Sequence, residues 1–189
     1  MIRARDVFTQ IQKLTSKLIE LGLAIDQCFP SIKELDNSQN LEVNISGIQS
    51  DITSIFLKKI PYRIMYHKLL ESRFYNIKMI DGALIQMQYM FCNDSIERHR
   101  LSFFPNPDVY LFKNYPELYL DNELYNDVID IRFVCVPLRL NFDNSTNDSG
   151  VTIAQPIVHP VSHLTIGQYT NCRIPVSSAL TPYQFIEFI

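Results

Sequence analysis

Apolar residues recur at intervals of three and four along the first twenty residues of the chain. The stripe consists of Val7, Ile11, Leu14, Leu18 and Leu21. This spacing predicts an amphipathic helix of about five turns that ends near Gly22. A single apolar stripe can pack on a sheet or against a second copy of the same helix, so both roles stay open for this segment.

The next stretch alternates between loop, strand and helix patterns. Residues 30–40 are rich in polar and turn-forming residues and predict a loop. Residues 41–46 alternate apolar and polar side chains, which indicates a strand. Helical spacing returns over 51–71, and Pro61 is expected in the first turn of a new helix because it needs no backbone N–H there.

The middle of the chain has the period of two that is typical of strands. Turn-forming pairs stand at 81–82 (Asp-Gly) and 93–94 (Asn-Asp), between runs of alternating residues. Residues 74–104 therefore predict a three-stranded antiparallel meander. Gln86 and Gln88 would point to one face of its second strand, and we expect that face to meet water or a ligand.

The remaining predicted elements, in chain order, are a long loop over 105–128, a long strand over 129–142 bent at Pro137, an exposed loop over 141–150, a hairpin around Gly167 and a final helix that begins at Thr181-Pro182. Together the elements predict an α+β fold, with an antiparallel meander sheet flanked by N-terminal and C-terminal helices. We expect a single domain over 1–189, with a mostly helical part over 1–72 and a β-rich part over 73–189.

Composition narrows the class of protein. The 189 residues are 47% hydrophobic and 20% charged, as in an ordinary globular domain. A net charge of -3 argues against a basic surface over the whole molecule but is compatible with a local basic patch. The four cysteines are widely spaced, which favours reduced thiols over a metal site. No secretory leader or membrane-spanning run is evident, so we expect a cytoplasmic protein with no membrane partner.

The sequence lacks the common fingerprints of nucleotide-binding loops and metalloproteases, and no cofactor or metal is expected. Its densest polar cluster is His159, His163 and Thr165, followed by Arg173. On a strand, His163 and Thr165 point to the same face. An imidazole beside a hydroxyl and a guanidinium can bind and polarise a phosphate. The structural alternative is that His163 and Arg173 only fix the end of a strand by hydrogen bonding.

Two further polar groups have simpler interpretations. Arg98, His99 and Arg100 follow a predicted turn, and we expect them to form a solvated surface. Arg139 and Asp143 lie close together at the end of a predicted strand, and we expect Asp143 to pair with Arg139.

Several segments together carry a family resemblance: 81–89 (DGALIQMQY), 100–105 (RLSFFP), 137–143 (PLRLNFD), 159–167 (HPVSHLTIG), 172–175 (CRIP) and 180–182 (LTP). They resemble the uncharacterised domain-of-unknown-function family twenty-two-ninety, over most of residues 60–189. The resemblance implies a bacterial, cytoplasmic protein of a kind met among mobile or defence-related genes, and it implies no assigned reaction. It also implies that the family continues past Ile189.

These features favour a prokaryotic defence or toxin–antitoxin component, and whether it is an enzyme stays open. As an enzyme it would cleave nucleic-acid phosphodiesters without a metal. His159 and His163 would be acid and base, Thr165 would orient the phosphate, and the phosphate would be held by Arg139 and Arg173. The alternative is a non-catalytic interaction subunit that binds a protein partner encoded nearby. An oligomer through the N-terminal helix is also left open.

Overall fold

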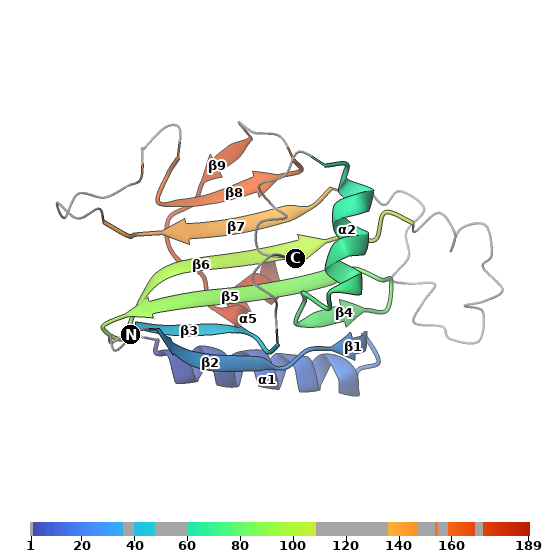
Figure 1. Ribbon diagram of the computed structural model, residues 1–189, viewed down its shortest axis with the longest axis horizontal. Helices are drawn as coiled ribbons and strands as arrows, with labels where there is room; N and C mark the ends of the chain where they lie inside the picture. The colour runs from blue at the N-terminus through green and yellow to red at the C-terminus, as the bar shows by residue number, and fades with distance from the viewer. Residues whose placement is uncertain are drawn as a thin grey trace.

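The computed structural model describes residues 2–35, 40–47, 60–108, 136–146, 154, 159–168 and 172–189. In chain order the elements are α1 (Ala4–Glu20), β1 (Ala24–Gln27), β2 (Pro30–Leu35), β3 (Asn40–Ile45), α2 (Tyr62–Glu71), β4 (Ile77–Met79), β5 (Leu84–Cys92), β6 (Ser95–Phe104), β7 (Leu138–Asp143), β8 (Ser162–Ile166), β9 (Arg173–Pro175) and α5 (Pro182–Phe188). The predicted α+β fold, with a mostly antiparallel sheet and a helix near each terminus, is confirmed (Figure 1). The predictions made for 51–59, 109–135 and 147–150 lie outside the described residues.

The described strands form one antiparallel sheet of nine strands. Its order is β1-β4-β5-β6-β7-β8-β9, and β3 pairs with the second half of β5 and carries β2 on its far side. The predicted meander is therefore β4-β5-β6. Both turn residues between β5 and β6, Asn93 and Asp94, have positive φ (49° and 61°), which matches the twist of a two-residue hairpin turn.

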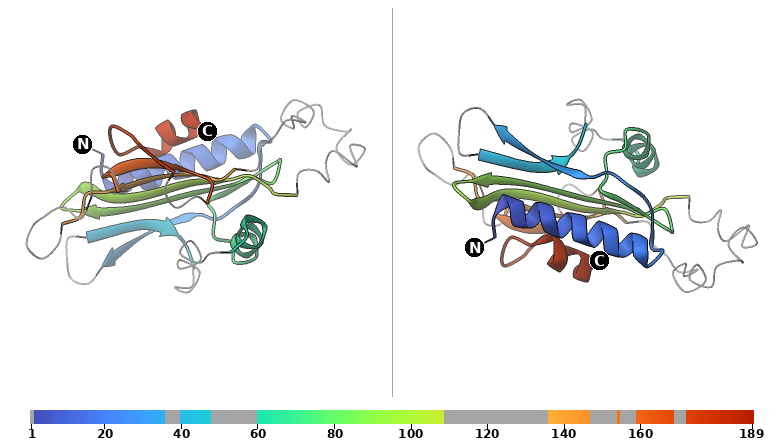
Figure 2. Two further views of the ribbon diagram at one scale, coloured as in Figure 1. Left: turned by 90° about the horizontal axis from the view of Figure 1, so that it is seen from above. Right: turned by 90° about the horizontal axis from the view of Figure 1, so that it is seen from below.

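The two terminal helices cover one face of the sheet, and that face is apolar. Val7 and Ile11 of α1 are fully buried in a core that includes Met87 of β5, Leu101 of β6 and Phe185 of α5. Figure 2 shows α1 and α5 on one side of the sheet and α2 on the other, with strands β2 and β3 curled toward the side of α2. The interpretation of the N-terminal helix as one that packs on a sheet is confirmed, whereas a dimer through this helix stays a prediction.

The second face of the sheet carries α2 at one end. Met65 and Leu69 of α2 pack against Leu84 and Phe104, which lie side by side at the adjoining ends of β5 and β6. Helix α2 begins directly after Pro61, one residue from the predicted position. The remainder of this face, over β6 to β9, carries polar side chains and is described below.

Residues 30–35 form strand β2, so the loop predicted there is wrong. β2 pairs with β3 along its whole length, from Pro30 opposite Ile45 to Leu35 opposite Asn40. Edge strands commonly present charged side chains to water. Lys33 and its neighbours on both sides are exposed, so β2 lacks the usual alternation of buried and exposed residues. Together with β1 and β3, this strand places three strands in the part of the chain before residue 72.

Helix α5 is attached to the sheet through a buried histidine. The backbone N–H of Leu180 donates to His99 Nε2 at 2.9 Å, and the Tyr89 hydroxyl donates to the Leu180 carbonyl at 3.0 Å. His99 is 4% exposed, so the prediction of a solvated surface is wrong for this residue. Thr181 caps the helix as predicted, and its hydroxyl accepts from the N–H of Gln184. Within the described ranges, no helix is both long and apolar enough to cross a membrane.

Candidate phosphate-binding face

Strand pairing brings together three of the residues predicted for a phosphate site. Arg139 on β7 lies opposite Thr165 on β8, and Thr165 lies opposite Arg173 on β9. Directly opposed residues of antiparallel strands share a face, with Cβ atoms about 5 Å apart. His163 lies two residues before Thr165 on β8, so it points to the same face.

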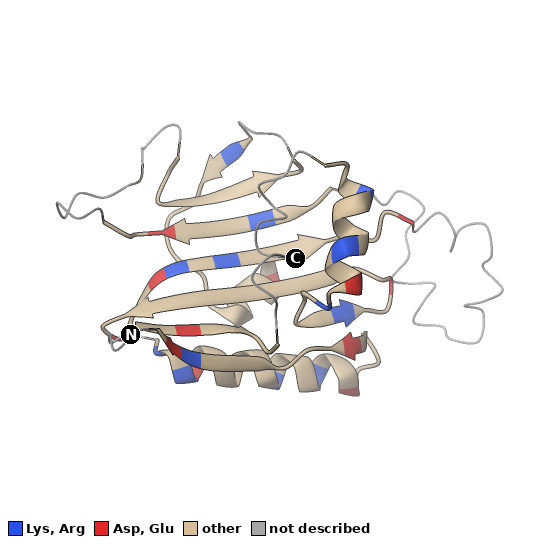
Figure 3. Ribbon diagram, viewed as in Figure 1, with Lys and Arg blue, Asp and Glu red and all other residues tan. Residues whose placement is uncertain are grey.

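We call this surface the arginine face and define it by the residues of β6 to β9 that point away from α1 and α5. These are Arg98, Arg100, Ser102, Arg139, Asn141, Asp143, His163, Thr165 and Arg173. Figure 3 is viewed onto this face and shows basic residues on β6, β7 and β9. The basic patch that the mild net charge allowed is therefore found on one side of the sheet.

The arginines of this face are close enough to disfavour one another's charge. Burial lowers the pKa of Arg139, and the positive charges of Arg100 and Arg173 lower it further. Burial also lowers the pKa of Arg100. The face includes one carboxylate, Asp143, which pairs with Arg98 at 3.2 Å rather than with Arg139 as predicted. Arg139 instead donates to the Gly167 carbonyl at 3.3 Å.

His163 is 3% exposed and is oriented by both ring nitrogens. Its Nδ1 lies 2.9 Å from the carbonyl oxygen of Pro160, so Nδ1 carries the proton and donates it. Nε2 then holds the lone pair and faces the side-chain amide of Asn141 at 3.5 Å. The bond to the Pro160 carbonyl is the one that the structural alternative predicted. The Nε2 lone pair, which accepts from the Asn141 amide in this structure, is the group that a general base would use.

The charge state of His163 follows from its surroundings. Its pKa is lowered mainly by burial. The Pro160 hydrogen bond opposes this effect, and nearby His159, Arg173 and Arg139 lower the pKa further. The imidazole is therefore neutral at pH 7. The His159 ring packs edge-on to it with ring centroids 5.0 Å apart, so the structure brings the two predicted histidines together.

A buried polar row that the sequence did not reveal extends the face toward β5. Gln86, Ser102 and Arg139 are cross-strand neighbours on β5, β6 and β7. Gln86 is 0% exposed, so the prediction that it meets water is wrong; its amide nitrogen donates to the Phe74 carbonyl at 3.0 Å. Gln86 Oε1, Ser102 Oγ and Arg139 Nε are buried and have no hydrogen-bond partner among the described residues. Only the register of the sheet, set by non-local pairing, places these atoms in one row.

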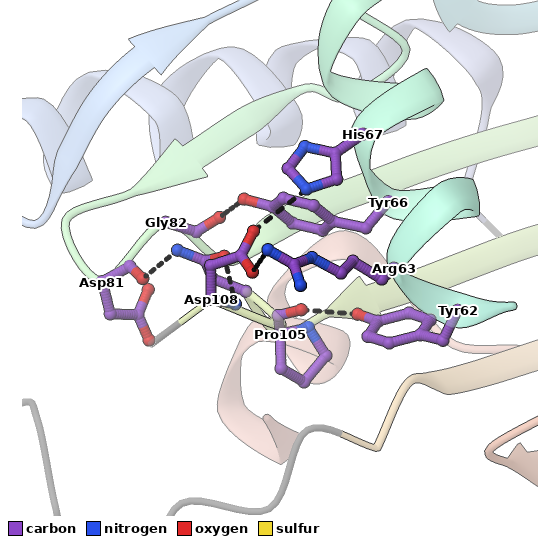
Figure 4. A network of polar contacts seen from close by, with 9 residues as sticks. Tyr62, Arg63, Tyr66, His67, Asp81, Gly82, Pro105 and Asp108 are labelled. Atoms are coloured by element: carbon purple, nitrogen blue, oxygen red, sulfur yellow. Dashed lines mark hydrogen bonds and ion pairs between the residues drawn. The ribbon is translucent and has the colours of Figure 1, made fainter. Parts of the chain in front are cut away.

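A second polar cluster fixes α2 to the turn between β4 and β5 (Figure 4). Asp108 forms an ion pair with Arg63 at 2.7 Å and lies 3.0 Å from His67 Nε2. The Tyr66 hydroxyl donates to the Gly82 carbonyl at 2.6 Å, and burial raises the pKa of this phenol above its usual range. Each of these contacts joins α2 to the turn or to the end of β6, so we assign the cluster a structural role.

The ligand chemistry of the face is that of an anion site. Within the part of the chain that the structure describes, no three His, Cys, Asp or Glu side chains are grouped as metal ligands. Guanidinium groups, a hydroxyl and side-chain amides are, by contrast, the donors that hold phosphate oxygens in proteins. The three predicted phosphate contacts, Arg139, Thr165 and Arg173, are all on this face.

The fold and the face define an α+β protein whose antiparallel sheet has one helix-covered apolar side and one cationic side. The chain belongs to the family described as uncharacterized conserved protein DUF2290, whose model matches residues 23–189. The resemblance found in the sequence is thereby confirmed, and α1 precedes the matched region. No curated protein and no solved structure matches the chain.

Proposed function

We propose that this protein binds the phosphodiester backbone of a nucleic acid on the arginine face and cleaves it without a metal, as a component of a bacterial defence or toxin–antitoxin system. The observation that carries the proposal is that Arg139, Arg173 and His163 share one face of the sheet. Burial lowers the pKa of His163, and the two arginines lower it further. An anion bound beside these side chains would favour their charged forms. A phosphate group supplies that charge and matches the guanidinium geometry.

The orientation of His163 supports its role as the base. The 2′-hydroxyl of RNA next to the phosphate is the nucleophile that suits this site, because a general base is enough to activate it. His163 Nε2 would take the proton of this hydroxyl, and the 2′-oxygen would form a bond to phosphorus. The bond from phosphorus to the 5′-oxygen would break, and protonated His159 would give its proton to that leaving oxygen. The products would be a 2′,3′-cyclic phosphate and a 5′-hydroxyl end.

The arginines and the threonine would act on the phosphate itself. Negative charge develops on the non-bridging oxygens as the 2′-oxygen attacks, and fixed donors aimed at those oxygens stabilise it. Arg139 and Arg173 would supply this stabilisation from either side of Thr165, whose hydroxyl would orient the phosphate.

The test compares cleavage of RNA and DNA by the wild-type protein, His163→Ala and Arg173→Gln. We expect the wild type to cut RNA, to leave DNA intact and to leave cyclic phosphate ends. Loss of an acid or base lowers the rate by roughly 10²–10⁴-fold, so His163→Ala should be almost inactive while it remains folded. Thermal unfolding of each variant separates lost chemistry from lost structure. Cleavage that needs no 2′-hydroxyl, or an active His163→Ala protein, would contradict the mechanism.

A specific observation also favours the second candidate, a non-catalytic interaction subunit. Five exposed large apolar side chains lie close together in the sequence, at the end of α1, on β1 and at β2: Ile19, Leu21, Ile25, Phe29 and Ile32. Contiguous exposed apolar residues mark protein interaction sites. Co-expression with the products of neighbouring genes tests this role. A stable complex that Ile25→Ser and Phe29→Ser disrupt, together with no nucleic-acid binding, would favour it over the nuclease.

A further inference from the structure

The arginines of the face lie along a bent line, which runs first along β6 and then across β7 and β8 to β9. Arg98 and Arg100 are two residues apart on β6, about 7 Å along the strand. Arg139 lies on β7, one strand across and one step further along, because Arg100 is opposite Asn141. The diagonal distance for such a pair is about 8 Å.

The line continues to the edge of the sheet. Arg173 is two strands beyond Arg139 in the same row, with Thr165 between them. Two strand spacings amount to about 10 Å. The Cα atoms of the four arginines thus cover about 20 Å in steps of about 7, 8 and 10 Å, and the long, flexible side chains allow each guanidinium to meet a phosphate of a flexible strand.

From this line we propose that the substrate is a single-stranded nucleic acid that follows the bend across β6 to β9 and places three or four phosphates on the arginines. The inference rests on the proposed function and names its substrate class. The polar side chains between the arginines, Asn141 and Thr165, are in place to contact the sugar and phosphate oxygens of the strand. His163 lies beside the middle of this path, where the scissile phosphate would be.

The surroundings of the arginines favour a single strand over a duplex. Arg100 and Arg139 are only partly exposed. Helix α2 and the β2–β3 pair project from the same side of the sheet as the arginine face (Figure 2). A duplex is wide and rigid, so its phosphates would be held above part-buried arginines, whereas a flexible strand can follow the sheet between these elements.

The length of the path is tested with fluorescent 2′-O-methyl oligouridylates of one to eight nucleotides, which lack the hydroxyl needed for cleavage. Fluorescence anisotropy should show affinity that rises with each nucleotide up to about four and then changes little. A contact with three phosphates of a single strand gives a slope of about −2 in a plot of log affinity against log salt concentration. A duplex of the same length should bind at least tenfold more weakly.

Variants along the line sharpen the test. Arg100→Gln, Arg139→Gln and Arg173→Gln should each weaken binding of the octamer about tenfold and reduce the salt slope by about 0.7. Asp143→Asn should tighten binding, because it releases Arg98 from its ion pair. Arg5→Gln is the matched control: Arg5 is exposed on α1, on the opposite side of the sheet, and its loss should change nothing.

Three results would contradict the single-strand path. A mononucleotide that binds as tightly as the tetramer would overturn the single-strand path but leave a phosphate site in place. A duplex that binds as tightly as the single strand would overturn the inference in the same way. If no probe binds and the line variants behave like Arg5→Gln, both the path and the proposed function are wrong.

Discussion

The buried histidine that holds α5 should make the protein sensitive to acid. Burial lowers the pKa of His99 from 6.5 to about 4. Between these values the unfolded chain binds a proton that the native protein does not, so stability falls as the pH falls from about 6.5 toward 4. The loss between pH 7 and pH 4.5 is about 2 kcal/mol for a shift of this size. Protonation also removes the lone pair that accepts from Leu180, so α5 should detach first.

The variant that tests this is His99→Gln, which keeps a hydrogen-bond acceptor for the N–H of Leu180 and removes the titrating group. Urea unfolding of the wild type and the variant, followed by circular dichroism at several pH values from 4.5 to 7.5, gives the two stability curves. We expect the variant to be less stable at pH 7, because the ring contacts of His99 with Tyr89 and Phe142 are lost. The difference between the proteins should then shrink by about 2 kcal/mol as the pH falls to 4.5.

The control is Tyr89→Phe, which removes the other hydrogen bond to Leu180 and leaves His99 able to titrate. This variant should be uniformly less stable and keep the pH dependence of the wild type. Parallel curves for wild type and His99→Gln would show that His99 does not titrate in this range on unfolding, and the reasoning from burial would be refuted.

Three further changes test other parts of the fold. Gly82→Ala should lower stability by about 1–2 kcal/mol in urea unfolding, because Gly82 has φ +84° and a Cβ would lie 2.6 Å from Asn106 Nδ2; an unchanged midpoint would contradict this. Thr181→Ala should cost about 1 kcal/mol through loss of the α5 cap, and Thr181→Ser should restore most of it. Arg139→Leu should leave the melting temperature unchanged or raise it while nucleic-acid binding weakens about tenfold, since buried charge is often replaced without loss of stability; unfolding of this variant would make Arg139 structural.

The parts of the fold that the sequence predicted are those with local determinants. The β5–β6 hairpin follows from Asn93-Asp94, the start of α5 from Thr181-Pro182, and α1 from its apolar stripe. The edge strand β2 was missed because Lys33 and its neighbours are exposed, so no buried face left a period in the sequence. His99 was misread for a related reason: its burial depends on α5, eighty residues further along, which no local pattern reveals.

The candidate site also combines features that follow from local sequence with features that depend on the packing of the whole sheet. The spacing of His163 and Thr165 on one strand was enough to place them on one face. That Arg139 and Arg173 lie on either side of Thr165 depends on the register of β7, β8 and β9, and register is fixed by how the whole apolar face packs. Arg100 was assigned to a solvated turn, although β6 is long enough to carry it into the middle of the sheet.

The two faces of the sheet differ in the side chains that they carry, and this difference supports the proposed function. Burial of alternate residues of β5 to β8 against α1 and α5 accounts for folding, and an antiparallel sheet can leave its second face in water. Here the second face is instead part-buried and carries Arg100 and Arg139, whose charged forms burial disfavours. Apolar side chains at these positions would continue the packing seen between α2 and Leu84. Arginines at these positions contribute less to stability than apolar side chains would, and this supports the proposal that the face binds an anion.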